Sequence, residues 1–181
     1  MRAIETSLLG VLLIEAQVYR DARGAFAEAW RASLYAELGI VDDFVQDNIS
    51  WSSRGVLRGL HYQNPNPQSK LIMAVHGTIF DVAVDLRQDS ATFLKWFGIE
   101  LSSDNMRQLY IPVGFAHGFM VTSDYAVVSY KCSDYYSPAA ERTIRWDDPQ
   151  LKINWPLANP ILSDKDARAP FVTGLPPAIF S

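Results

Sequence analysis

The sequence lacks several features that are typical of secreted and membrane-bound proteins. Among its 181 residues there is one cysteine, Cys132, which cannot form a disulfide within the chain. A lone cysteine agrees with a reducing compartment such as the cytoplasm. No apolar run approaches the roughly 20 residues that a membrane-spanning helix needs, and residues 8–14, the best candidate, lie between Glu5 and Glu15. We therefore expect a cytoplasmic protein outside the membrane, with a first β-strand at residues 8–14.

Positive charge is also scarce. The chain carries 16 lysines and arginines against 20 aspartates and glutamates, which gives a net charge of −4. Proteins that bind nucleic acids or anionic membranes need clustered positive charge, so neither partner is expected. The apolar fraction of 49% is ordinary for a globular protein, and the length suits one domain with a sizeable core. We predict a single domain over residues 1–181.

Short β-strands dominate the predicted secondary structure. The clearest one follows Gly77, where apolar side chains of residues 78–86 alternate with Asp81 and Asp85. The two aspartates then face solvent, which is the default for an antiparallel sheet, or they line a polar cavity. Further strand-like runs cover residues 71–75, 97–101, 109–112, 118–122 and 126–132. Strands at this close spacing indicate an antiparallel sandwich or barrel.

Helix is predicted in only two places. Residues 28–38 form the better candidate, which ends at Gly39, and a single turn is expected near residues 163–167. The proline-containing stretch 146–170 is expected to wrap the sandwich, and residues 172–181 carry no pattern. The chain is therefore predicted to be an all-β protein with a few short helices.

The three histidines, His61, His76 and His117, limit the possible chemistry. Metal-binding cupins usually supply several histidines and a carboxylate, with two histidines one residue apart on a strand. Here Gln63 occupies the second of these positions after His61, and a three-histidine site would also need His76, which lies at a predicted turn. A metal-dependent cupin oxygenase is therefore the disfavoured interpretation.

Local sequence leaves the role of His61 open between a packed core residue and a functional group. It lies in the run Arg-Gly-Leu-His-Tyr-Gln, which brings a cation, an imidazole and an amide close together. Along a regular strand, however, Arg58 and His61 point to opposite faces. Both can serve one pocket only if Gly59 marks a bulge or bend in the strand.

His117 and the tyrosines near residue 130 are the other candidates. His117 lies between Gly114 and Gly118 in what we predict to be a tight loop at the mouth of a strand, and it suits a structural or a functional role equally. Buried tyrosines usually pack with a hydrogen-bonded hydroxyl, so a proton-donor role for Tyr130 is the less common alternative.

Taken together, these segments resemble the dTDP-4-dehydrorhamnose 3,5-epimerase family. The similarity runs in one consistent order from about residue 10 to about residue 170. It covers Asp21-Ala22-Arg23-Gly24-Ala25-Phe26, Gln46-Asp47-Asn48, and residues 55–63, 68–71, 80–87, 112–119, 130–138, 146–149, 155–156 and 162–166. The resemblance implies a cupin-type antiparallel jelly roll and an isomerase that uses neither a metal nor any other cofactor.

The chemistry implied by the resemblance is epimerisation of dTDP-4-dehydro-6-deoxy-D-glucose at C3 and C5. The C4 ketone acidifies both neighbouring C–H bonds, so the reaction needs a base, an acid on the opposite face and a group that holds the enolate. By motif, His61 is the base and Asp166 its carboxylate partner. Tyr130 is then the acid, and Lys70, with His117, stabilises the enolate oxygen.

The resemblance also assigns the nucleotide-binding residues. Arg23 and Arg58 bind the diphosphate with Lys165 nearby, and Tyr136 stacks on thymine, with Tyr135 as the alternative. The remaining contacts fall to Phe26, Glu28, Gln46, Asp47, Asn48 and Glu141. In the family, the segment that holds Arg23, Phe26 and Glu28 reaches into the neighbouring subunit. We therefore expect a homodimer with shared active sites, with the N-terminal strands and the C-terminal tail at its interface.

Two further interpretations compete with this one. A relative that epimerises only C3 or only C5 uses the same base, acid and lysine, because the difference lies in how the sugar ring sits. A sugar-nucleotide-binding cupin without catalysis needs no opposed base and acid. An enzyme is therefore favoured by the joint occurrence of His61, Asp166, Tyr130 and Lys70.

Overall fold

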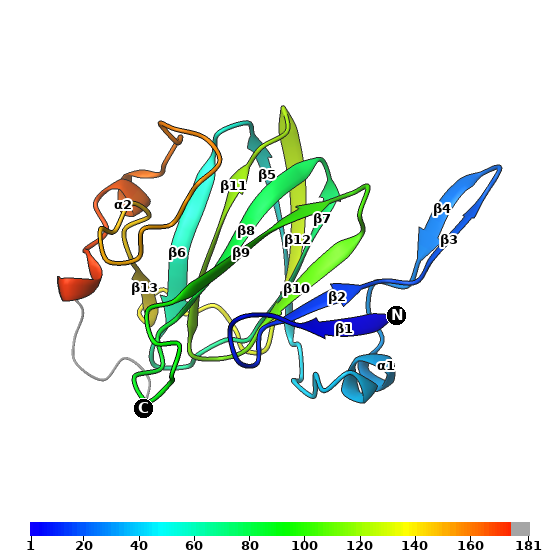
Figure 1. The fold of residues 1–181 in the computed structure, drawn as a ribbon, viewed down its shortest axis with the longest axis horizontal. Helices are drawn as coiled ribbons and strands as arrows, with labels where there is room; N and C mark the ends of the chain where they lie inside the picture. Colours follow the sequence, from blue (N-terminus) through cyan, green and yellow to red (C-terminus); the bar gives the residue numbers. More distant parts are fainter. Residues whose placement is uncertain (175–181) are drawn as a thin grey trace.

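Two antiparallel β-sheets face each other in the computed structural model, which describes residues 1–174 (Figure 1). The six-stranded sheet has the order β1 (Arg2–Glu5), β2 (Leu12–Glu15), β10 (Arg107–Ile111), β7 (Lys70–His76), β12 (Tyr125–Cys132), β5 (Gln46–Ser53). The five-stranded sheet has the order β13 (Glu141–Thr143), β6 (Leu57–Gln63), β11 (Phe115–Val121), β8 (Thr78–Asp85), β9 (Trp96–Ser102). Strands that are distant in sequence lie side by side, as in a jelly roll, and the predicted cupin-type fold is confirmed.

A separate hairpin, β3 (Val18–Asp21) and β4 (Gly24–Ala27), projects from the sandwich (Figure 1). The helical elements are α1 (Ala32–Glu37), α2 (Asp164–Ala167) and the 3₁₀ turn η1 (Val172–Gly174). Both predicted helical regions are confirmed, although α1 is shorter than expected because Arg31 has an extended backbone. Within residues 1–174, none of the helices has the length and apolar composition needed to cross a membrane.

The main core lies between the sheets. Alternating side chains from both inner faces meet there, and the central ones are almost fully buried. They include Leu13, Ile72, Ala83, Leu101, Leu109, Phe119, Val121 and Val128. Burying one large apolar side chain contributes about 1.5–3 kcal/mol, so this layer fixes the relative position of the two sheets and of any polar groups they carry.

The C-terminal segment covers the outer face of the five-stranded sheet, as predicted. Val82 and Val84 on β8 pack there against Leu151 and Trp155. Because that outer face is buried, the aspartates of β8 point between the sheets, and the expectation that Asp81 and Asp85 face solvent is wrong. Burial alone raises the pKa of Asp85, but hydrogen bonds from neighbouring side chains outweigh it and lower the pKa to about 2. These donors are Arg87, Ser90 and Thr92.

Two strands at the chain's N-terminal side differ from expectation. The predicted strand at residues 8–14 begins only at Leu12, because Leu8 and Gly10 lie in the turn after β1. Strand β5 covers Gln46–Ser53, which is not among the predicted strands. Its polar side chains face inward and its apolar ones, Ile49 and Trp51, face outward and are more than half exposed, which inverts the usual pattern.

Candidate active site

A bulge in β6 places Arg58 and His61 on the same face. Phe119 pairs with Arg58 and His117 pairs with His61, so three steps on β6 oppose two on β11. Gly59 allows this, because its φ is +133° and an added Cβ would lie 2.5 Å from the Cα of Gly118. Arg58 and His61 both line one cavity of about 450 Å³. The structural condition that the sequence set for a shared pocket is therefore met.

Asp166 reaches His61 from the C-terminal segment. Its Oδ1 lies 2.7 Å from Nε2 of His61, and its carboxylate is 4% exposed. Ser163 caps helix α2 by accepting a hydrogen bond from the Asp166 N–H, which fixes the aspartate. Burial raises the pKa of Asp166, but the hydrogen bonds and positive charge around the carboxylate, those of His61 foremost, together outweigh it, and the pKa is lowered. The carboxylate therefore stays ionised and accepts the Nε2–H proton, which leaves the lone pair of the neutral imidazole on Nδ1.

A second cavity of about 290 Å³ lies between the two sheets at one end of the sandwich, and His61 lines it as well. His61 comes from the five-stranded sheet, whereas Tyr130 and Lys70 come from the six-stranded sheet. The register of β12 with β7 pairs Tyr130 with Ile72 and Cys132 with Lys70, so all four side chains share the inner face. The cavity is lined by Gln46, Asn48, His61, Tyr62, Gln63, Gln68, Lys70, Tyr130, Cys132, Tyr136 and Glu141.

Tyr130 is suited to give up a proton rather than to carry a charge. Burial is the main reason why its pKa is raised above the ordinary value, and the nearby Cys132 raises it further. Within residues 1–174 its hydroxyl forms no hydrogen bond that would occupy it. A neutral, unoccupied phenol facing the base across a cavity is the arrangement that general acid catalysis requires.

Lys70 brings a positive charge into the same cavity. Its Nζ donates to Gln68 Oε1 at 2.9 Å and to Cys132 Sγ at 3.7 Å, and it lies 5.7 Å from the centre of the Tyr130 ring. Within the described part of the chain, no carboxylate forms an ion pair with it. Burial raises the pKa of the Cys132 thiol although Lys70 acts in the opposite direction. The ammonium charge therefore remains available to an anion in the cavity.

Tyr136, Glu141 and Lys165 form a cluster at the cavity's rim. The Tyr136 hydroxyl donates to Glu141 at 3.0 Å, and Lys165 pairs with Glu141 at 2.6 Å. Burial raises the pKa of Glu141, but the hydrogen bonds from Lys165 and Tyr136 outweigh it, and the pKa is lowered. Tyr136 lines the cavity and Tyr135 does not, so the geometry favours Tyr136 as the stacking residue.

The three cations expected at the diphosphate differ in how they are occupied. Arg23 pairs with Asp21 at 2.5 Å, and Lys165 pairs with Glu141. Arg58 donates only to the hydroxyl of Ser52, at 3.1 Å, and forms no ion pair within residues 1–174. Of these three cations, Arg58 is therefore the one that can bind an anion without first leaving a carboxylate.

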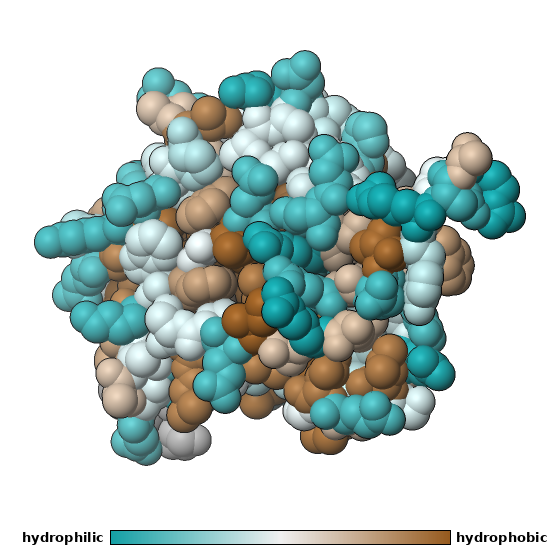
Figure 2. Space-filling view, turned by 45° about the vertical axis from the view of Figure 1, so that its right-hand side comes forward, coloured by the Kyte–Doolittle hydropathy of each residue, from teal (hydrophilic) through white to brown (hydrophobic). Residues whose placement is uncertain are grey.

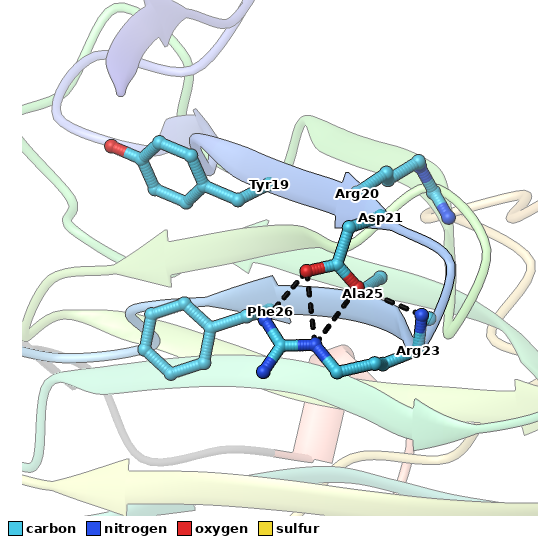
Figure 3. A pocket seen from close by; sticks show the side chains of 7 residues that line it. Tyr19, Arg20, Asp21, Arg23, Ala25 and Phe26 are labelled. Atoms are coloured by element: carbon cyan, nitrogen blue, oxygen red, sulfur yellow. Dashed lines mark hydrogen bonds and ion pairs between the residues drawn. The ribbon is translucent and has the colours of Figure 1, made fainter.

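Three predicted residues, Arg23, Phe26 and Glu28, lie away from the cavity of this chain. Arg23 and Phe26 are on the projecting hairpin, where Phe26 lies beside Tyr19 and Arg23 folds back onto Asp21 (Figure 3). Glu28 follows the hairpin and pairs with Arg31. Figure 2 shows the hairpin standing out from the surface, with a mostly hydrophilic tip. That these residues serve a neighbouring subunit stays a prediction.

Asp47 and His117 also differ from their predicted places. Asp47 points to the outer face of β5 and binds Lys131 at 2.9 Å, because successive residues of a strand alternate and its neighbours Gln46 and Asn48 face the cavity. His117 lies inside strand β11 rather than in a loop, and its Nε2 is 2.9 Å from Asp81. It is 7% exposed and lines neither cavity.

Sequence reasoning assigned no role to several residues that line the cavity. Two of them could have been found from their spacing. Gln63 lies two residues after His61, and Gln68 lies two residues before Lys70, so in an extended strand each would face the same side as a predicted site residue. The amide of Gln63 is bound to the backbone of Ser137, Asn66 and Tyr135. Within residues 1–174, no three His, Cys, Asp or Glu side chains are grouped so that they could hold a metal ion.

The cupin-type sandwich thus places a carboxylate-bonded imidazole and a neutral phenol on opposite sides of one cavity, an arrangement suited to acid–base chemistry. The dTDP-4-dehydrorhamnose 3,5-epimerase family model matches residues 5–173, and the chain belongs to that family. A dTDP-4-dehydrorhamnose 3,5-epimerase of Shigella flexneri is 51% identical over 168 residues, which are 92% of this chain and 93% of the relative. The chain is therefore an isomerase.

Solved structures agree with this assignment. The epimerase of Legionella pneumophila, in complex with dTDP-4-keto-L-rhamnose, is 50% identical with a TM-score of 0.94, covering 97% of this chain and 94% of its own. A 3'-monoepimerase of Streptomyces bikiniensis, in complex with dTDP-quinovose, is 33% identical with a TM-score of 0.87, covering 96% and 88%. The same fold therefore occurs in epimerases that differ in the carbons they invert.

Proposed function

We propose that this enzyme epimerises dTDP-4-dehydro-6-deoxy-D-glucose at C3 and C5 and so forms dTDP-4-dehydro-L-rhamnose. The observation that carries the proposal is the pair formed by His61 and Asp166 on one side of a cavity that Tyr130 and Lys70 line from the other sheet. The relatives named as 3,5-epimerases support reaction at both carbons, since they are about half identical to this chain. The lone Cys132 supports a cytoplasmic location.

The proposed reaction begins with removal of a proton. Nδ1 of His61 takes the hydrogen of the carbon beside the C4 ketone, and the C–H electrons form the enolate with its charge on O4. The ionised Asp166 stabilises the imidazolium that results. The Lys70 ammonium stabilises the enolate oxygen, which is charged only after the proton has left.

The second half of the reaction inverts the carbon. The phenol of Tyr130 donates its proton to the opposite face of the enolate, and the electrons return from O4 to re-form the ketone. Water then takes the proton from His61 and returns one to Tyr130. Proton gain and loss balance over the cycle, and because the C4 ketone supplies the acidity, the reaction needs neither a redox cofactor nor a metal.

We also propose that the enzyme acts as a homodimer in which the hairpin completes the partner's site. In support, the Arg23 side chain is 90% exposed and Phe26 is 69% exposed on an arm that leads away from the cavity of its own chain. Exposed apolar side chains on the neighbouring strands β5, β7 and β12 offer a surface that a second copy can bury. They are Ile49, Trp51, Val75 and Tyr125.

Proton exchange in heavy water tests the reaction directly. The enzyme is incubated with dTDP-4-dehydro-6-deoxy-D-glucose in D₂O, and the signals of H3 and H5 are followed by NMR. Deuterium should enter at both carbons, because each hydrogen lies beside the C4 ketone and is removed by a base that exchanges with solvent. The rate should not change after treatment with a chelator.

The competing interpretations give different results in this experiment. Exchange at a single carbon would identify a single-carbon epimerase and contradict reaction at both positions. Absence of exchange despite dTDP binding would indicate a sugar-nucleotide-binding cupin without catalysis. Loss of activity with the chelator, together with a stoichiometric transition metal by elemental analysis, would indicate a metal-dependent enzyme.

Mixing two inactive variants tests the shared site. In the proposed dimer, an Arg23→Ala/Phe26→Ala subunit has an intact His61 but an impaired hairpin, and a His61→Ala subunit has the reverse. When both are unfolded and refolded together in equal amounts, half of the dimers are mixed and each mixed dimer has one intact site. About a quarter of the wild-type activity should therefore return.

The control for this experiment is each variant refolded alone, which should stay at its own low activity. Formation of mixed dimers is checked with an affinity tag on one variant. If tagged and untagged subunits copurify but activity does not return, the hairpin does not act in the partner's site and the shared-site proposal is wrong.

A further inference from the structure

Three glutamines hold the loop that carries Tyr136. Each of residues 134–137 has one backbone group that is hydrogen-bonded to a glutamine side chain. Gln46 Oε1 accepts from the Tyr136 N–H at 2.8 Å, and Gln63 Oε1 accepts from the Ser137 N–H at 2.7 Å. Gln68 Nε2 donates to the carbonyl of Asp134 at 2.7 Å. The loop is therefore fixed by side chains of the cavity wall.

Gln68 is the only one of these three whose amide also contacts Lys70. Its Oε1 accepts from Nζ of Lys70 at 2.9 Å. The orientation of the amide is determined by its partners, because an ammonium can only donate and a backbone carbonyl can only accept. A single glutamine therefore links the cation of the cavity to the backbone of the Tyr136 loop.

Lys70 has little else to hold it in place. A lysine side chain has a flexible four-carbon stem, and it loses conformational entropy when its ammonium is held in one place. The second partner of Nζ is the Cys132 sulfur at 3.7 Å, a weak acceptor. Gln68 and Cys132 together take two of the three ammonium protons, so one N–H remains for a ligand.

We propose that Gln68 is a positioning residue that directs the Lys70 ammonium toward the enolate oxygen. It also links the position of this ammonium to the loop that carries Tyr136. The inference rests on the role of Lys70 in the proposed function. Glutamine suits this role because its neutral oxygen holds the ammonium without cancelling its charge. A carboxylate at position 68 would hold the ammonium too, but it would neutralise the charge beside a developing anion.

Two substitutions separate positioning from general support of the loop. Gln68→Met keeps the length of the side chain and removes both hydrogen bonds, and it should lower kcat by about 10-fold to 30-fold. The dissociation constant for dTDP should change by less than about threefold, because Gln46 and Gln63 still hold the backbone of Tyr136 and Ser137. Gln68→Glu keeps an acceptor for Lys70 but should lower kcat at least as much, because its charge opposes the enolate.

The decisive measurement is made in a Lys70→Met background. Gln68→Met should have almost no further effect on kcat there, since the group that it positions is absent. The matched control is Gln63→Met, which also removes contacts with residues 135–137 but does not touch Lys70. Its effect should appear in dTDP binding and should add to that of Lys70→Met.

The outcomes distinguish failure of this inference from failure of the proposed function. If Gln68→Met lowers kcat by the same factor with and without Lys70, Gln68 only supports the loop and the inference is wrong. It is also wrong if Gln68→Glu retains the wild-type kcat, a result that remains informative should Gln68→Met not fold. If Lys70→Met alone leaves kcat unchanged, the role proposed for Lys70 fails first, and the role of Gln68 fails with it.

Discussion

Replacing His61 with alanine should lower proton exchange at the substrate carbons by about 10³-fold, the size expected for loss of a well-oriented general base. Nδ1 of His61 is the proposed proton acceptor, and its Nε2 side is held by Asp166 at 2.7 Å. Binding of dTDP should change only a few-fold, because the nucleotide is held by other groups, Arg58 and Tyr136 among them. Exchange is measured by NMR in D₂O and binding by calorimetry.

The control for this prediction is His76→Ala. His76 ends strand β7 at a turn, is exposed, and lines neither cavity, so its loss should leave exchange and binding at wild-type values. Survival of exchange in His61→Ala would contradict the assignment of the base. If exchange and dTDP binding were lost together in His61→Ala, the result would indicate a structural role for His61, because its side chain also contacts Asp166 in the C-terminal segment.

Strands with a regular alternation were predictable from the sequence. Strand β8 follows Gly77, has apolar residues on one face and Asp81 and Asp85 on the other, and lies at Thr78–Asp85 in the structure. The burial of Asp81 and Asp85 was not predictable, because it depends on what covers the other face of the sheet. That cover is formed by residues more than 60 positions later in the chain, and local periodicity carries no information about it.

For strand β5, by contrast, the strand itself was not predicted. Its residues Gln46–Ser53 are mostly polar, and a polar run next to Arg54 and Gly55 is typical of a turn. The strand is polar because its inner face forms a wall of the cavity, where Gln46 and Asn48 lie. The inner face of β5 therefore lacks the apolar pattern by which a strand is usually recognised, because it faces a cavity and not the apolar core.

The arrangement of the catalytic candidates was also predictable only in part. The condition on Gly59 followed from strand geometry alone, and the bulge is present. The contact between His61 and Asp166 joins residues 105 positions apart, so only the resemblance to a family could suggest it. Asp47 shows the limit of a motif, because it lies within a matching stretch while its side chain points to the outer face.

A second large effect is expected from Tyr130→Phe, which should separate proton exchange from inversion. The base and the lysine remain, so His61 can still remove the proton and return a deuteron to the same face. Inversion needs a donor on the opposite face, and it should fall by about 10²-fold or more without the phenol. In D₂O, NMR should therefore show deuterium in substrate that keeps its original configuration.

The pKa of Tyr130 sets the pH range of this comparison. Because burial raises it above the ordinary value of about 10, the phenol stays protonated throughout the neutral and moderately alkaline range. The ratio of exchange to inversion in the wild type should then be constant there, and it should rise only when the phenol ionises at higher pH. In the phenylalanine variant, which has no group to titrate at this position, the ratio should stay high at every pH.

The matched control is Tyr135→Phe, because Tyr135 lies on the same loop as Tyr136 but is 66% exposed and does not line the cavity. Its exchange and inversion should both stay at wild-type rates. If exchange and inversion fall together in Tyr130→Phe, the phenol contributes to proton removal or to sugar binding, and the acid has to be sought elsewhere. If only inversion falls, base and acid act on opposite faces of the same carbon, which is the arrangement that epimerisation requires and that sugar binding alone does not.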